Sequence, residues 1–125
     1  MQQTAVGKKT LVLGASENPS RYSYLAVRKL ESYGHPVVAL GRKKGKVGTT
    51  EIATGQVPLN NIDTVTLYLN PANQEEWLDY ILGLNPRRII FNPGTENDAL
   101  IRAAKEAGIE PVIGCTLVML SIGNY

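Results

Sequence analysis

Apolar residues form five short, continuous runs along the chain, and longer segments of mixed composition separate them. The runs cover residues 11–13, 37–40, 65–69, 88–91 and 111–113. Continuous apolar runs are typical of strands that are buried on both faces, as in a parallel sheet. Glycine, asparagine or proline follows each run, so we expect a loop at the carboxyl end of each predicted strand.

Three of the segments between the runs carry apolar residues at helical spacing. They predict helices over residues 21–33, 74–84 and 96–107. Asn73 and Thr95 are the expected N-caps of the second and third helices, because an acidic residue stands three positions after each of them.

Two further segments have a weaker pattern. Glycines and a proline interrupt residues 41–63, where we expect a loop with at most a short strand and one helical turn. The apolar tail after Cys115 predicts either a short helix or a contact surface, which would join the chain to a second copy in a homodimer or to a partner protein.

Strands alternating with helices predict a Rossmann-like, doubly wound α/β fold. We expect a five-stranded parallel sheet in the order 3-2-1-4-5 with helices on both faces. The chain would then reverse direction between strands 1 and 4, and a ligand crevice is expected outside their carboxyl ends. The loops expected to reach this edge contain Gly14, Gly41, Asn70-Pro71 and Asn92-Pro93-Gly94.

Composition narrows the class of protein. The 125 residues are enough for one domain over residues 9–125, with residues 1–8 as an N-terminal extension. A net charge of +2 is too small to indicate nucleic acid or a membrane surface as a partner. The chain has no apolar run long enough for a bilayer, its N-terminus has no signal-peptide core, and its single cysteine allows no internal disulfide. We therefore expect a cytoplasmic protein.

The most informative stretch is the first strand–loop–helix junction, residues 9–24. Such a junction offers unpaired N–H groups and the positive end of a helix, which suit a phosphate. Arg21 at the helix start is unfavourable to the helix dipole unless an anion binds there. The dinucleotide fingerprint G-x-G-x-x-G is incomplete, because Ser16 and Pro19 replace its second and third glycines.

The end of the second strand favours a ligand with a phosphate on its ribose. NAD-binding folds place an acidic residue near this position, whereas this chain has Arg42, Lys43 and Lys44. Cationic side chains suit the 2′-phosphate of NADP or the 3′-phosphate of coenzyme A (CoA). The alternatives are a plain tight turn in the first loop and a solvated basic loop after the second strand.

Residue patterns indicate no complete catalytic set. His35 lies in a Gly-His-Pro turn at the opposite end of the second strand, Cys115 has no histidine near it in sequence, and Ser16 lacks the G-x-S-x-G setting of a hydrolase. Binding without turnover is therefore the favoured interpretation. An NADP-dependent oxidoreductase, with Tyr68 or Ser16 as proton donor, is one alternative. A non-catalytic regulatory or interaction subunit that uses residues 117–122 is the other.

The opening loop, Gly14-Ala15-Ser16-x-Asn18-Pro19-Ser20-Arg21-x-Ser23, is similar to that of the small stand-alone CoA-binding domain proteins. Their fold resembles the N-terminal, CoA-binding domain of the succinyl-CoA synthetase alpha subunit. The likeness continues through residues 33–37, 48–52, 62–65 and 107–109 to Cys115, nearly the whole chain. The resemblance implies a Rossmann-like fold, CoA or an acyl-CoA as ligand, and no established reaction.

The same resemblance implies a role for each matching position. It implies that the diphosphate is cradled by Gly14, Ala15, Ser16 and Arg21, with Ser23 beside them. It also implies that the adenosine phosphate meets Arg42 and Lys43, and that the adenine or pantetheine path is lined by Asn70 and Pro71. This chain has Gly41-Arg42 where the family usually has an Asn-Pro pair, and Asn92-Pro93-Gly94 where it often has a Gln-Glu-Gly-like loop. The active-site histidine of the synthetase lies outside the matching domain, so no ligase activity is implied.

Overall fold

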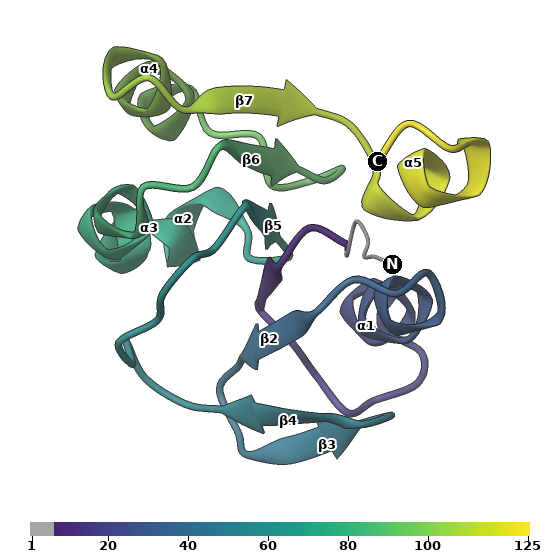
Figure 1. The fold of residues 1–125 in the computed structure, drawn as a ribbon. Coiled ribbons are helices and arrows are strands. Elements are labelled where there is room, and N and C mark those ends of the chain that lie inside the picture. The colour runs from purple at the N-terminus through teal and green to yellow at the C-terminus, as the bar shows by residue number, and fades with distance from the viewer. Residues whose placement is uncertain (1–6) are drawn as a thin grey trace.

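The strands form one sheet in the computed structural model, which describes residues 7–125 (Figure 1). Its order is β3-β4-β2-β1-β5-β6-β7, and all neighbours are parallel except β3, which is antiparallel to β4. The strands are β1 (Thr10–Leu13), β2 (Val37–Leu40), β3 (Gly45–Val47), β4 (Thr50–Ala53), β5 (Thr64–Leu67), β6 (Arg88–Phe91) and β7 (Glu110–Ile113). Residues 1–6 of the expected N-terminal extension lie outside the described part.

The predicted mostly parallel α/β class is confirmed, but the number and order of the strands were wrong. All five predicted runs are strands, and the glycine-broken segment 41–63, where at most one short strand was expected, forms both β3 and β4. With β4 beside β2, the run at 65–69 pairs directly with β1 and does not lie beyond β2. The chain therefore reverses direction between β1 and β5, whereas we expected the run at 88–91 as the partner of β1.

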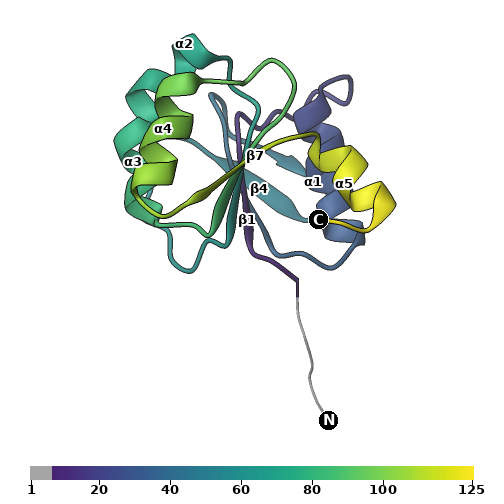
Figure 2. The same ribbon diagram turned by 90° about the horizontal axis from the view of Figure 1, so that it is seen from above.

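Helices cover both faces of the sheet, as predicted for a doubly wound fold. Helices α1 (Tyr22–Ser32) and α5 (Thr116–Ile122) lie on one face (Figure 2). The other face is covered by α2 (Pro71–Gln74), the 3₁₀ turn η1 (Glu75–Trp77), α3 (Leu78–Leu84) and α4 (Asp98–Glu106). Side chains of β1 alternate between two cores: Leu11 and Leu13 join the core under α3 and α4, and Val12 joins the core under α1 and α5.

Two predicted helix caps were wrong, because the helices begin at different residues. The second predicted helix starts three residues early, at Pro71, and the Asn70 side chain accepts a hydrogen bond from the Asn73 N–H at 2.9 Å. The third starts after Asn97, whose side-chain oxygen accepts from the N–H groups of Ala99 and Leu100. In both cases the N-cap is the asparagine directly before the helix. Its backbone is extended, and its side-chain oxygen accepts the N–H groups of the first turn.

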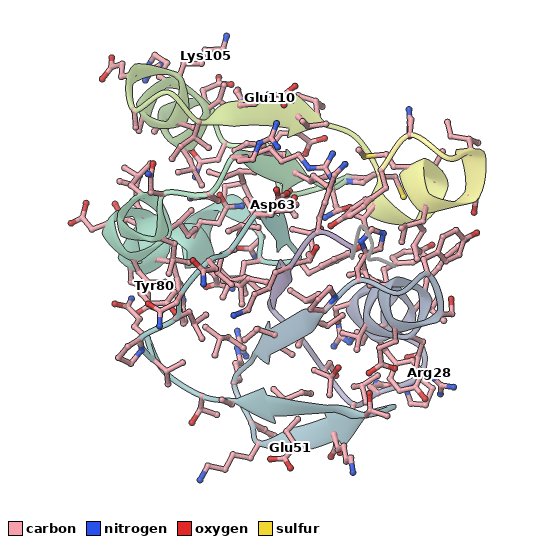
Figure 3. All side chains as sticks on the ribbon, viewed as in Figure 1. Arg28, Glu51, Asp63, Tyr80, Lys105 and Glu110 are labelled. Atoms are coloured by element: carbon pink, nitrogen blue, oxygen red, sulfur yellow. The ribbon has the colours of Figure 1, made fainter. Side chains whose placement is uncertain are left out.

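The long connection between β4 and β5 contains no helix and is held against α3. The hydroxyl of Tyr80, which lies beside this connection, donates to the carbonyl of Val57 at 2.5 Å (Figure 3). In the described part of the chain, no helix combines the length and the apolar character that crossing a bilayer requires. The apolar tail forms α5, which buries Leu120 and leaves Val118 and Ile122 exposed; its contact with a second subunit stays a prediction.

Tyr125 holds the end of α5 at the amino end of the sheet. Its hydroxyl lies 2.6 Å from Thr10 Oγ1, and its ring centroid is 4.8 Å from that of His35. The Arg88 guanidinium lies over the same ring at 4.3 Å, and Lys8 Nζ donates to the Tyr125 carbonyl. This cluster fixes His35 at the edge opposite to the expected crevice.

Within this cluster His35 is kept neutral. Its Nδ1 accepts the backbone N–H of Lys8 at 2.9 Å, which requires an unprotonated nitrogen. Burial and the nearby charges of Lys8 and Arg88 lower the pKa of His35 below its ordinary value of 6.5. Because the folded-state pKa lies below the unfolded one, the neutral imidazole stabilises the fold above pH 6.5, and this contribution is lost as the pH falls through the folded-state pKa.

We therefore expect stability to fall on acidification through His35. The variant His35→Gln keeps an acceptor for the Lys8 N–H but does not titrate. Between about pH 7 and pH 5, the melting temperature of the wild type should fall more steeply than that of the variant. Differential scanning fluorimetry at constant ionic strength measures both slopes, and equal slopes would contradict this assignment.

Candidate functional site

The carboxyl ends of the central strands meet at one edge, as the sequence predicts. Leu13 of β1 is level with Leu40 of β2 and with Leu67 of β5, and Leu67 is level with Phe91 of β6. The loops at Gly14, Gly41, Asn70 and Asn92 follow these strand ends directly or within three residues. The chain changes direction between β1 and β5, so the order of the strands puts the expected ligand position outside the carboxyl ends of these two strands.

Two glycines let three backbone segments meet at this edge. Gly14 has a φ of +99°, and a Cβ on it would lie 2.8 Å from the carbonyl oxygen of Tyr68, just after β5. A Cβ on Gly41, just after β2, would overlap the carbonyl oxygen of Ala15. Side chains at either position would push the loops apart, so both glycines are required by close approach.

Hydrogen bonds show which amides of the first loop the sheet already uses. The N–H groups of Gly14 and Ala15 both donate to the carbonyl of Leu40 at 2.9 Å. An anion could accept these two N–H groups only if their bonds to Leu40 were broken. The amides that remain for an anion are therefore those that follow Ala15 in the chain. The described residues provide no acceptor for the next backbone N–H groups of the loop and of the first turn of α1, those of Ser16, Glu17, Tyr22 and Ser23.

Residues 16–20 order their own loop. Ser16 Oγ accepts the N–H of Asn18 at 3.1 Å, and Asn18 Oδ1 accepts the N–H and the hydroxyl of Ser20 at 3.0 and 2.8 Å. The Asn18 carbonyl then accepts the N–H of Arg21. These local side-chain bonds hold the loop in one shape before any ligand arrives.

Arg21 is the N-cap residue of α1 and is exposed, with an extended backbone. Its side chain lies at the positive end of an 11-residue helix, a place that favours an anion. Ser23 is only 4% exposed, so its hydroxyl faces the packed side of the helix. Of these two predicted site residues, Arg21 has the open position.

The cationic residues Arg42, Lys43 and Lys44 are all exposed and follow β2 directly. They lie between Gly41, which touches the first loop at Ala15, and Gly45, which touches it at Glu17. Their charges therefore line the same edge as the loop after β1, as the sequence predicts.

Asn92, a predicted site residue, is buried and belongs to the frame of the site. Its Nδ2 donates to Thr66 Oγ1 and to the Leu67 carbonyl at 2.7 and 2.8 Å, and its Oδ1 accepts the Thr116 N–H at 2.9 Å. With 2% exposure, it joins β5, β6 and α5 and has little surface for a ligand. Pro93 and Gly94 after it are exposed.

The loop after β5 presents Asn70 and Pro71, which are exposed and start α2. Gln74, which no sequence pattern identifies as a site residue, joins this loop to the next one. Its Nε2 donates to the carbonyls of Leu69 and Thr95, both at 2.8 Å, and it is almost fully buried. A glutamine in a predicted helix gives no signal of this role, because the two carbonyls come from loops far apart in sequence.

Tyr68, which the oxidoreductase alternative needs as a proton donor, has its hydroxyl buried. It packs in the core under α1 and α5, and in the described part its buried hydroxyl has no hydrogen-bond partner. Burial, and to a smaller degree the nearby Cys115, raise the pKa of Tyr68, so its proton is held more tightly. Among residues 7–125, no three His, Cys, Asp or Glu side chains form a metal-binding group.

We expect Asn92→Ala to destabilise the protein, because it leaves the Thr116 N–H and the Leu67 carbonyl without their partner. The free energy of unfolding should fall by about 3 kcal/mol. Urea denaturation followed by circular dichroism measures it, and Asn124→Ala, an exposed asparagine, is the matched control. Equal stability of the two variants would show that Asn92 does not hold the frame.

Comparison with known proteins identifies a family to which the chain is similar. A family model described as "CoA binding domain" matches residues 8–121. The crystal structure of an uncharacterized protein is 53% identical, covers 97% of this chain and 100% of its own, and superposes with a TM-score of 0.93. A protein from Thermus thermophilus is 24% identical, with 95% of this chain and 91% of its own covered and a TM-score of 0.83.

A larger enzyme shares the fold. The dinucleotide forming acetyl-coenzyme A synthetase 1 of Ca. Korarchaeum cryptofilum, solved in complex with phosphate and ADP, is 16% identical. The match covers 87% of this chain and 26% of that enzyme, with a TM-score of 0.70. No protein with a curated description matches the chain. The family match over residues 8–121, together with the loop that follows β1, identifies the chain as a member of the CoA-binding domain family.

Proposed function

We propose that the chain binds CoA or an acyl-CoA at the carboxyl edge of the sheet, outside β1 and β5, and does not itself convert it. The loop between β1 and α1 carries the proposal. It is ordered by its own hydrogen bonds, has N–H groups without an acceptor in the described part, and ends on the exposed Arg21 at a helix start. Membership of the CoA-binding family supports CoA as the anion that binds there.

The proposed orientation follows the order of the strands. The diphosphate lies at Ser16, Arg21 and the first turn of α1, and the 3′-phosphate of the adenosine lies toward β2, where Arg42 and Lys43 are exposed. The pantetheine arm then runs the other way, over the loops after β5 and β6. Its path passes the exposed residues Asn70, Pro71, Pro93 and Gly94.

A binding role fits the side chains of this edge better than hydride transfer does. Tyr68 is packed in the core with a raised pKa, and Ser16 Oγ belongs to the local hydrogen bonds of its own loop, where it accepts the Asn18 N–H. These were the two proton donors that an NADP-dependent oxidoreductase would need. The basic run suits the ribose phosphate of either nucleotide, so NADPH is the informative competitor in a binding test.

Thermal stability tests the proposal. At about one hundred times its dissociation constant a ligand adds about 2.7 kcal/mol to the free energy of unfolding, which should raise the melting temperature by several degrees. We expect this shift with CoA, acetyl-CoA or a longer acyl-CoA, and not with NADPH. A shift with NADPH alone, or none with any CoA species, would contradict the proposal.

We expect the cationic residues Arg42 and Lys43 to contact the 3′-phosphate of CoA. The double variant Arg42→Ala/Lys43→Ala should weaken CoA about tenfold and dephospho-CoA by less than about twofold. Isothermal titration calorimetry measures both affinities. The control, Arg102→Ala/Lys105→Ala, removes two exposed charges from α4, of which Lys105 is labelled in Figure 3, and should change neither affinity. An equal loss for both ligands would show that the run does not contact this phosphate.

A further inference from the structure

We propose that Glu17 is a positioning residue that sets the distance between the diphosphate loop and the cationic run, and so gives the site its preference for CoA over dephospho-CoA. This inference rests on the proposed function. Glu17 belongs to the loop after β1, yet its side chain points to the hairpin of β3 and β4.

The contact between Glu17 and the hairpin is direct. Glu17 Oε2 accepts the backbone N–H of Lys46 at 3.0 Å. A Cβ on Gly45 would lie 2.5 Å from the Glu17 carboxyl carbon, so the approach requires a glycine at this position. Because β3 is an edge strand, its outward N–H groups face no further strand, and Glu17 pairs one of them.

This contact is one of two that the first loop makes with the cationic run, whose ends are also held by the Gly41 N–H bond to the Ala53 carbonyl and by the pairing of Gly45 with Ile52. Arg42, Lys43 and Lys44 form an arch between Gly41 and Gly45. One end of the arch rests on the first loop, where Gly41 meets the Ala15 carbonyl, and the other end is fixed where Gly45 and Lys46 meet Glu17. The loop that is proposed to bind the diphosphate therefore also carries both ends of the segment proposed to bind the 3′-phosphate.

If Glu17 acted only through its charge, it would weaken CoA binding and not favour it, because a carboxylate beside an anion site repels the ligand. Positional and electrostatic roles therefore predict different results for two substitutions. Glu17→Gln removes the charge and keeps an oxygen that can accept the Lys46 N–H, whereas Glu17→Ala removes both.

The test is the ratio of the affinities for CoA and dephospho-CoA, measured by isothermal titration calorimetry on the full chain. We expect Glu17→Ala to lower this ratio about three- to fivefold, with dephospho-CoA nearly unchanged, and Glu17→Gln to keep it. Gly45→Ala should lower it as Glu17→Ala does, because the added methyl group displaces the carboxylate. Glu51→Ala is the control: it removes an exposed carboxylate from the same hairpin, opposite Lys46, and should leave the ratio unchanged (Figure 3).

Each other result has a defined meaning. An unchanged ratio in Glu17→Ala, or an equal loss for both ligands, overturns the inference and leaves the proposed function standing. A Glu17→Gln variant that behaves like Glu17→Ala also overturns it, because the charge and not the contact would then matter. A wild type that binds neither ligand contradicts the proposed function itself.

Discussion

The close approach of the loop after β1 to the ends of β2 and β5 is the constraint on which the site depends. Gly14 meets the Tyr68 backbone, Gly41 meets the Ala15 carbonyl, and the Leu40 carbonyl accepts two N–H groups of the loop. These contacts use the first two amides of the loop for the sheet. The N–H groups of Ser16, Glu17, Tyr22 and Ser23 are left without an acceptor in the described part, which makes this edge suitable for an anion.

The frame beneath that edge is built from buried polar side chains. Asn92 joins β5 and β6 to the start of α5, and Thr66 Oγ1 lies 2.8 Å from Thr116 Oγ1 in the same network. At the other end, Tyr125 holds the chain after α5 beside His35. The seven-residue α5 buries only one large apolar side chain, that of Leu120. Its position therefore depends also on the polar contacts at its two ends.

Sequence patterns predicted the parts of the fold that depend on local order. Apolar runs located the strands of the buried sheet, and the family resemblance located the loop after β1. The hairpin of β3 and β4 was not predicted as two strands because it has no continuous apolar run: β3 buries only Val47, and in β4 Glu51 is exposed between the buried Thr50 and Ile52. The occupied amides of Gly14 and Ala15, the burial of Asn92 and the turn of Glu17 toward Lys46 depend on partners far away in sequence, so no local pattern could reveal them.

The central claim is that a CoA-type anion binds where the loop after β1 enters α1. Amide hydrogen exchange followed by NMR, with and without saturating CoA, tests it residue by residue. We expect new protection at Ser16, Glu17, Tyr22 and Ser23, whereas the amides of Gly14 and Ala15 should exchange slowly even without ligand because they donate to the Leu40 carbonyl. Protection confined to the opposite edge around His35, with no change at these four amides, would contradict it.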